Sequence, residues 1–188
     1  MIKKYKQYIK ESINSDIDPY GEEDWDIDNL SPILQIAKKT GKPYDQITEL
    51  YCSGEQLTSL EGIENLINLR TLDCQNNQLT SLNGIENLID LEILNCSENE
   101  LASLEGIEKL INLKLLNCSY NQLTSLAGIE NLINLKYLWC SNNQLANLDG
   151  IENLTNLKHL NCNNNLFSIK YIYYIKDYCK EKNIRLIL

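Results

Sequence analysis

The chain has 188 residues, of which 43% are hydrophobic, and its formal net charge at pH 7 is −9. No stretch offers the roughly 18 consecutive apolar residues of a membrane-spanning helix, and the acidic excess argues against binding nucleic acid or an anionic membrane surface, which depends on Lys and Arg. Because the seven cysteines are an odd number and no apolar stretch follows the N-terminus, we expect free thiols in a reducing, cytoplasmic compartment.

Residues 1–28 divide into a basic and an acidic stretch, and we expect this segment to be partly flexible. Residues 1–13 are rich in lysine and have apolar residues at helical spacing, which predicts a short amphipathic helix. Residues 14–28 concentrate aspartate and glutamate around Pro19 and Gly21, which favours a loop or a disordered segment.

The first twelve residues, MIKKYKQYIKES, also resemble the capsid-targeting peptides of large tailed phages. Those peptides are cut after a triplet of the form that Ile9-Lys10-Glu11 has. The resemblance implies a virion-associated protein cut after Glu11. The alternative is an ordinary amphipathic start to the chain.

Residues 29–48 predict an N-terminal cap. Ser31 is a good N-cap, Pro32 suits the first helical position and Gly41 suits a C-terminal stop, so we expect a helix over 31–40. Its apolar face can cover the open end of a stack of strands, and it consists of Ile33, Leu34, Ile36 and Ala37.

Cysteine recurs every 22 residues without interruption, at Cys52, Cys74, Cys96, Cys118, Cys140 and Cys162. A fixed period of roughly 20–50 residues indicates a stacked repeat rather than a globule with one central core. We therefore expect six repeats over residues 49–166, and we look for function where the repeats differ.

The second repeat places Leu69, Leu72, Cys74, Asn77 and Leu79 in the pattern LxxLxCxxNxL. This is similar to the leucine-rich repeat consensus, with cysteine in place of the third leucine. The 22-residue period and the Gly-Ile-Glu-Asn-Leu half resemble the internalin-like class of bacterial repeats. The resemblance implies an α/β solenoid: a horseshoe with a parallel concave sheet, short convex helices and helical caps at both ends.

Three further series follow the same register. In the family the repeated asparagine is buried and bonds to the backbone of its own and the adjacent turn, which implies the same role for Asn77, Asn99, Asn121, Asn143 and Asn165. The first repeat has Glu55 there, which puts the burial of that turn in doubt. The repeated glycines predict either positive φ angles or a close approach of the backbone, and we expect the helix dipole to stabilise the glutamates that follow them.

Residues 167–188 break the pattern and predict a C-terminal cap, a helix followed by a final strand from Ile184. The expected apolar side of that helix comprises Ile169, Ile172, Ile175 and Cys179.

The cysteine ladder is interpreted as core packing, because a file of parallel thiols does not converge on one metal ion. Disulfides between neighbours would require the side chains to rotate out of their packed positions. His159, the single histidine, has no Asp or Glu on its own strand. We expect no catalytic residue, no metal site, no cofactor and no enzyme activity.

Counting by 22 gives the outward columns of the concave sheet. The first column is Glu49, Thr71, Ile93, Leu115, Tyr137 and His159; the second is Tyr51, Asp73, Asn95, Asn117, Trp139 and Asn161; the third is Ser53, Gln75, Ser97, Ser119, Ser141 and Asn163; the fourth is Gly54, Asn76, Glu98, Tyr120, Asn142 and Asn164.

Apolar and aromatic residues gather in the third to sixth turns, and exposed Trp and Tyr are typical of binding hot spots. The expected partner-binding residues are Ile93, Leu115, Tyr120, Tyr137, Trp139 and His159. The alternative explanation is that strands favour aromatic residues.

The leucine-rich repeat resemblance implies a monomeric protein-interaction module that binds through its concave face. From the net charge we expect a protein partner with a basic or an aromatic-binding surface. A third hypothesis is the recognition domain of an enzyme system.

Overall fold

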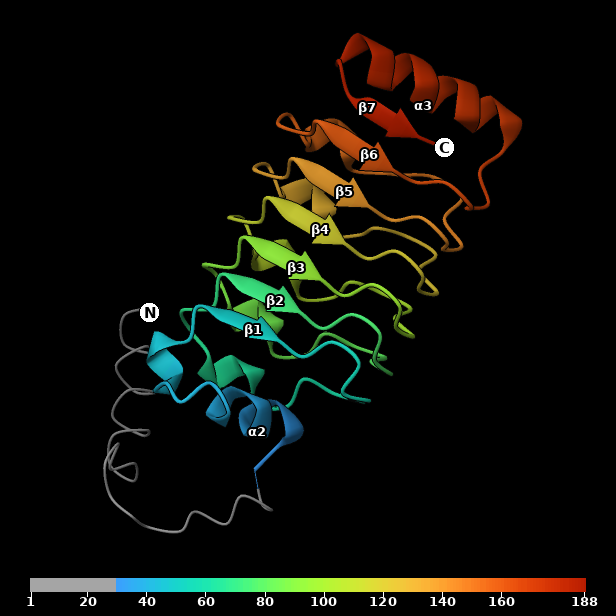
Figure 1. Ribbon diagram of the computed structural model, residues 1–188. Coiled ribbons are helices and arrows are strands. Elements are labelled where there is room, and N and C mark those ends of the chain that lie inside the picture. Colours follow the sequence, from blue (N-terminus) through green and yellow to red (C-terminus); the bar gives the residue numbers. More distant parts are fainter. Residues whose placement is uncertain (1–29) are drawn as a thin grey trace, which may run out of the picture.

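The computed structural model describes residues 30–188, which form one solenoid around a seven-stranded parallel sheet (Figure 1). The strands pair in chain order. They are β1 (Glu49–Tyr51), β2 (Thr71–Asp73), β3 (Ile93–Asn95), β4 (Leu115–Asn117), β5 (Tyr137–Trp139), β6 (His159–Asn161) and β7 (Arg185–Ile187). The expected solenoid is confirmed. The expectations for residues 1–28, including the cut after Glu11, lie outside the described residues.

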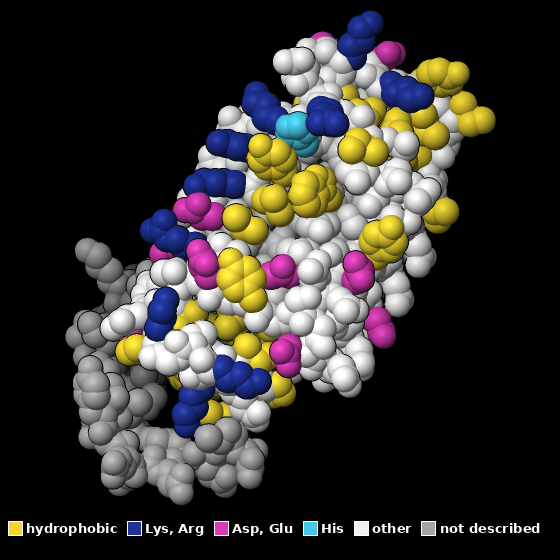
Figure 2. Space-filling model, viewed as in Figure 1, with side chains coloured by type: hydrophobic (Ala, Val, Ile, Leu, Met, Phe, Trp, Pro, Cys, Tyr) yellow, Lys and Arg dark blue, Asp and Glu magenta, His cyan; other side chains and the backbone are white. Residues whose placement is uncertain are grey.

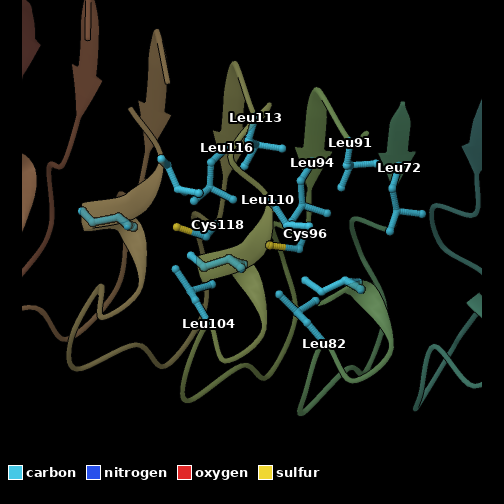
Figure 3. Close-up of a cluster of buried hydrophobic side chains, with 14 of the residues drawn as sticks. Leu72, Leu82, Leu91, Leu94, Cys96, Leu104, Leu110, Leu113, Leu116 and Cys118 are labelled. Carbon is cyan, nitrogen blue, oxygen red and sulfur yellow. The ribbon is translucent and has the colours of Figure 1, made fainter. Parts of the chain in front are cut away.

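Each strand is three residues long and directs its middle side chain into the core. In β3 and β4 these residues are Leu94 and Leu116, both fully buried. The two strands pair with Ile93 opposite Leu115, so the counted register of 22 residues is confirmed. Figure 3 shows Cys96 and Cys118 between the strand leucines and those of the opposite side of the turn. Burying a leucine stabilises the folded state by about 1.5–3 kcal/mol. Because leucines are buried at the same places in successive turns, each turn adds a similar stabilisation.

The opposite side of each of the first five turns holds the expected short helix, which is a 3-10 helix of three residues. These helices are η3 (Ile63–Asn65), η4 (Ile85–Asn87), η5 (Ile107–Lys109), η6 (Ile129–Asn131) and η7 (Ile151–Asn153), and a further one, η2 (Tyr44–Gln46), precedes β1. Three residues align too few peptide dipoles for the expected dipole effect on the glutamates.

A direct hydrogen bond takes the place of that dipole effect. The backbone N–H of Gly84 donates to Glu86 Oε2 over 2.8 Å, and the same bond recurs at Glu64, Glu108 and Glu130. The φ of Gly84 is +98°, and a Cβ there would lie 2.8 Å from Ile63 Cγ2. Glycine is therefore required both by the backbone angle and by the close approach of the preceding turn.

The repeated asparagine joins each turn to the one before it. Asn121 Oδ1 accepts from the N–H of Leu101 at 2.9 Å, and Asn121 Nδ2 donates to the carbonyls of Cys96, Cys118 and Ser119. The same pattern repeats at Asn77, Asn99, Asn143 and Asn165. The bonds satisfy backbone groups that would otherwise be buried without partners.

This geometry explains the exception in the first repeat. Glu55 is exposed, yet Cys52 and Leu57 of the same turn are buried at 0% and 3% exposure. The N–H of Leu57 donates to Asn77 of the next turn at 2.9 Å. Each asparagine bonds to the turn before its own. No turn precedes the first repeat, so that repeat does not need an asparagine, and the doubt about the burial of the first turn was wrong.

The N-terminal cap is the expected helix, α2 (Pro32–Lys38). Ser31 Oγ accepts from the N–H of Leu34 at 3.4 Å and so caps it. Ile33 and Ala37 are fully buried against the first turns. The helix therefore closes one end of the core (Figure 1).

The C-terminal cap is α3 (Ile169–Glu181) followed by β7, which pairs with β6. Ile175 and Cys179 are buried as expected, but Ile169 is 76% exposed, so its place in the buried side was wrong. Tyr171 and Tyr178 pack against the core instead.

The tyrosine hydroxyls explain this orientation of α3. The Tyr171 hydroxyl accepts from the N–H of Leu148 at 2.8 Å, and the Tyr178 hydroxyl donates to the carbonyl of Ile151 at 3.3 Å. These backbone groups belong to the fifth turn, which carries the last Gly-Ile-Glu-Asn-Leu segment of the repeat pattern. An isoleucine has no polar atom with which to satisfy them.

Candidate functional site

The outward side chains of β1–β7 form one side of the molecule, which we call the sheet face. Apolar side chains gather on it beside the single histidine, with a file of Lys and Arg along one margin (Figure 2). Ile93, Tyr137 and Trp139 are 39%, 37% and 37% exposed, whereas Leu115 and His159 are half-buried. We call these five residues and Tyr120 the sheet-face patch.

The strand register brings members of the patch together. The first column runs from Ile93 through Leu115 and Tyr137 to His159, each residue opposite the next on adjacent strands. The rings of Tyr137 and His159 stack with centroids 4.9 Å apart and an interplanar angle of 10°. Trp139 lies two residues beyond Tyr137 on the same side of β5, because side chains alternate along a strand.

Tyr120 follows β4 and has an unusual backbone. Its φ is +55°, in the left-handed region, and its side chain is 57% exposed. The same place in the other turns is occupied by Gly54, Asn76, Glu98, Asn142 and Asn164, all with positive φ. Glycine and asparagine tolerate this conformation, whereas it costs most other residues about 1–2 kcal/mol. Nothing in the fold requires a tyrosine at this place.

The third outward column does not belong to the sheet face in the middle turns. Ser97, Ser119 and Ser141 are only 3%, 6% and 4% exposed, so they do not offer the hydrogen bonds expected of an outward column. Each strand ends one residue before its cysteine, and the chain then turns inward. Ser97 Oγ donates to Asn95 Oδ1 at 2.8 Å and is satisfied within the turn.

Aromatic exposure extends beyond the predicted patch. Tyr51 in β1 is 63% exposed, and its hydroxyl donates to Glu49 Oε2 at 3.2 Å. The C-terminal cap exposes Ile169, Tyr173 and Tyr174 as well. These residues provide matched exposed side chains outside the patch.

A row of cations beside the patch escaped the sequence analysis. It consists of Lys114, Lys136 and Lys158, which directly precede β4, β5 and β6, and of Arg185 in β7; we call these four residues the basic row. The 22-residue spacing of the three lysines was visible in the sequence, one position before the first column. Arg185 lies opposite His159 of that column. The backbone of the row is fixed, because Lys136 N–H donates to Lys114 and Lys158 N–H donates to Lys136.

The start of the basic row borders a groove of about 570 Å³, lined by Arg70, Asp90, Glu92, Asn112, Lys114, Asn134, Lys136 and Asn156. Asparagines here form a second ladder: Asn134 Nδ2 donates to the carbonyl of Ile111 at 2.9 Å, and Asn156 Nδ2 to that of Ile133 at 2.8 Å. Their amide groups hold neighbouring turns together. Among the cations that line the groove, Arg70 and Lys114 pair with Glu92, whereas Lys136 forms no ion pair within residues 30–188.

The charge of the side chains that line the groove changes sign along its length. Glu92 forms ion pairs with Lys114 and with Arg70, the latter at 3.3 Å. The hydrogen bond from Lys114 lowers the pKa of the Glu92 carboxyl. The margin of the patch is therefore not negatively charged, although the whole chain is. A basic partner surface, which the net charge predicts, would be repelled by Lys136 and Lys158.

The cysteines form an unreactive interior. All seven are free and buried, as expected for core packing. Loss of solvation on burial raises the pKa of Cys52 and Cys162 to about 12 and that of Cys179 to about 11. Because the thiolate is the nucleophile and the metal ligand, these groups stay protonated near neutral pH.

Within residues 30–188, no group of three or more His, Cys, Asp or Glu side chains is placed to hold a metal ion. Over the same range, none of the helices has the length and apolarity needed to cross a membrane.

Comparison with known sequences identifies two regions of the chain. The family described as Leucine Rich repeats (2 copies) matches residues 45–87 and 133–170. No curated protein sequence gave a significant match.

Solved structures of bacterial proteins share the fold. A leucine-rich repeat protein of Leptospira interrogans is 32% identical with a TM-score of 0.63, and the match covers 67% of this chain and 33% of that protein. The functional domain of InlJ from Listeria monocytogenes, which includes a cysteine ladder, is 28% identical with a TM-score of 0.59, over 66% of this chain and 32% of InlJ. The chain thus spans about a third of the length of each.

An internalin of Listeria monocytogenes, InlF, shows the fold at 24% identity with a TM-score of 0.55. That match covers 77% of this chain and 48% of InlF.

Proposed function

We propose that this chain, a leucine-rich repeat protein, binds a protein partner through the sheet-face patch. Leucine-rich repeat proteins generally serve as protein-interaction modules. The proposal adds the place of contact: an apolar segment of the partner packs over Tyr137 and Trp139, with Tyr120 at the margin.

The observation that carries the proposal is the exposed aromatic pair on β5. The outward positions of neighbouring strands hold Leu115, Asn117, His159 and Asn161, so the sheet forms without tyrosine or tryptophan there. Tyr137 and Trp139 leave more than a third of their surface in solvent. Aromatic side chains of this kind carry much of the free energy at protein interfaces, because they bury large areas on binding.

Tyr120 supports the proposal independently. A tyrosine in left-handed backbone reduces stability where asparagine would not, and its exposed ring gains little from burial in return. Strained residues cluster at functional sites. Partner binding explains why a tyrosine occupies position 120, whereas the requirements of folding do not.

The test starts from peptides selected on the immobilised protein from a displayed random library. The affinity of each selected peptide is then measured by calorimetry for the wild type and for Trp139→Ala and Tyr137→Ala. We expect losses of about thirtyfold or more, which correspond to about 2 kcal/mol or more.

Tyr51→Ala and Tyr173→Ala are the matched controls, because both remove an exposed tyrosine outside the patch. We expect these variants to change the affinity by less than about twofold. Equal losses in patch and control variants, or unchanged affinity in Trp139→Ala, would refute the proposed site.

A further inference from the structure

The basic row contains cations that nothing in the described part of the chain neutralises. Lys114 pairs with Glu92, but within residues 30–188 neither Lys136, Lys158 nor Arg185 forms an ion pair. All three side chains are exposed. Glu92 thus ends the row on one side, and the remaining cations face solvent beside the patch.

The sheet holds these cations close together. The N–H of Lys158 donates to the carbonyl of Lys136 at 2.9 Å, and the N–H of Arg185 donates to that of Lys158 at 2.8 Å. Neighbouring strands lie about 4.8 Å apart. The like charges of Lys136 and Lys158 at this spacing repel each other. The fold does not require a cation there, because the same position in earlier turns holds Thr48, Arg70 and Glu92.

We propose that the partner contacts this site with an acidic, extended peptide segment whose Asp or Glu side chains bind Lys136, Lys158 and Arg185 while an adjoining apolar side chain packs on Tyr137 and Trp139. The inference rests on the proposed function and adds the chemical class of the partner. Charge complementarity of this kind speeds association and excludes partners of the wrong sign.

The charges on the rest of the sheet face indicate the direction in which the partner's peptide segment lies. The first turns contribute Glu49 and Asp73 to the outward columns, and Glu98 follows β3. An acidic stretch therefore fits over β5–β7, and its neutral or basic end fits over β1–β3. A continuous polyanion such as RNA would meet the acidic turns, so the charge pattern favours a peptide of mixed composition.

The experiment uses the full chain and a displayed library of random peptides of about twelve residues. Selection is run in parallel on the wild type, on the variant K136E/K158E/R185E, and on the control variant K170E/K176E/K180E, which has the same net charge but changes exposed lysines of α3. Synthetic copies of the selected peptides are then titrated at low salt and at about 1 M salt, where screening is strong.

The proposal expects Asp and Glu to be enriched among peptides selected on the wild type and on the α3 control, and to be depleted on the row variant. Peptides selected on the wild type should bind the row variant at least about tenfold more weakly, and salt should weaken them on the wild type. Peptides without acidic enrichment, or with equal affinity for the row variant, would overturn it, as would a selection that yields no binding peptide.

Two further probes identify other occupants. A single-stranded RNA oligonucleotide that binds more tightly than the selected peptides, and does so through the row, would overturn the proposal in favour of nucleic acid. A synthetic peptide of residues 14–28 that outcompetes them would assign the site to the chain's own acidic segment and overturn the inference of an outside partner.

The two proposals can fail separately. Selected peptides that lose affinity for Trp139→Ala but show no acidic enrichment would leave the proposed function standing and remove this inference. Selected peptides that are acidic but bind Trp139→Ala with unchanged affinity would refute the sheet-face patch as the binding site.

Discussion

The two sides of each strand follow opposite rules. On β5 the inward Leu138 is fully buried, while its neighbours Tyr137 and Trp139 face outward. The inward place is leucine in all six repeats, whereas the first outward column never repeats a residue from turn to turn. The interior is constrained by packing against identical turns, and the sheet face is free to vary once the interior is satisfied.

That difference separates stability from recognition in this molecule. Interior substitutions should act on the free energy of unfolding, and sheet-face substitutions on binding. Substitutions on both sides of the strands test this separation.

Replacing the interior asparagine should have the largest effect. Asn121→Ala removes four hydrogen bonds and leaves the N–H of Leu101 and the carbonyls of Cys96 and Cys118 with fewer partners in a dry interior. We expect a loss of about 3 kcal/mol or more in the free energy of unfolding, because each unsatisfied buried group costs about 1–3 kcal/mol. Urea denaturation measures it.

Glu55→Ala is the matched control, since Glu55 holds the same place in the first repeat but is exposed. It should change stability by less than about 0.5 kcal/mol. Similar losses in the two variants would contradict the role assigned to the asparagines.

Neighbouring residues of β5 test the separation within one strand. Leu138→Ala should destabilise the fold by about 2–5 kcal/mol, as is typical of a buried leucine. Trp139→Ala should cost about 1 kcal/mol or less, because its side chain is partly solvated. Thermal or urea unfolding compares them directly, and a larger loss for Trp139→Ala would break the comparison.

The cysteine ladder should make stability sensitive to alkaline pH. An unfolded thiol ionises near pH 8.5, whereas burial raises the pKa of Cys52 to about 12 in the folded chain. Above about pH 9 the unfolded state therefore binds fewer protons, and the free energy of unfolding falls by up to about 1.4 kcal/mol per pH unit for each thiol. This stability is complete below about pH 8 and is lost as the pH rises towards 12.

Denaturation at a series of pH values between about 8 and 9.5 measures this slope before tyrosines ionise. Cys118→Ala should reduce the slope by the share of one thiol, whatever it does to stability at pH 7. A slope that is flat over this range would show that the thiols are less buried than the structure indicates.

Tyr120→Asn should give the smallest change, and of opposite sign. Asparagine tolerates the left-handed backbone at φ +55° better than tyrosine does, so we expect a gain of about 0.5–1 kcal/mol. Partner binding should weaken in the same variant. A loss of stability in thermal unfolding would show that Tyr120 serves the fold.

Much of the architecture follows from the sequence because the register is unbroken. Counting from Cys52 gives β1–β6 and the first two outward columns, and Ser31 marks the start of the N-terminal capping helix. The patch residues Tyr137 and Trp139 were placed correctly on the outward side for the same reason. Whether they bind a partner stays a prediction.

The errors share one physical cause: they occur where the chain leaves the regular geometry of the repeats. Ser119 was counted as outward because strand alternation was extended past the end of β4, where the chain turns inward. Ile169 was assigned to the buried side of α3 from helical spacing alone. That spacing does not reveal that Tyr171 and Tyr178 satisfy backbone polar groups of the fifth turn.

The sequence by itself determined the period, the interior and the list of outward side chains, because each repeat makes the same contacts with its neighbours. Only the tertiary structure decided which of those side chains stay exposed, which cations lack partners and how the caps are oriented. Those properties depend on contacts between turns and at the two ends of the stack. Lys114 and Lys136 show this: they are alike in the sequence, but Lys114 pairs with Glu92 of the preceding turn, whereas Lys136 forms no ion pair within residues 30–188.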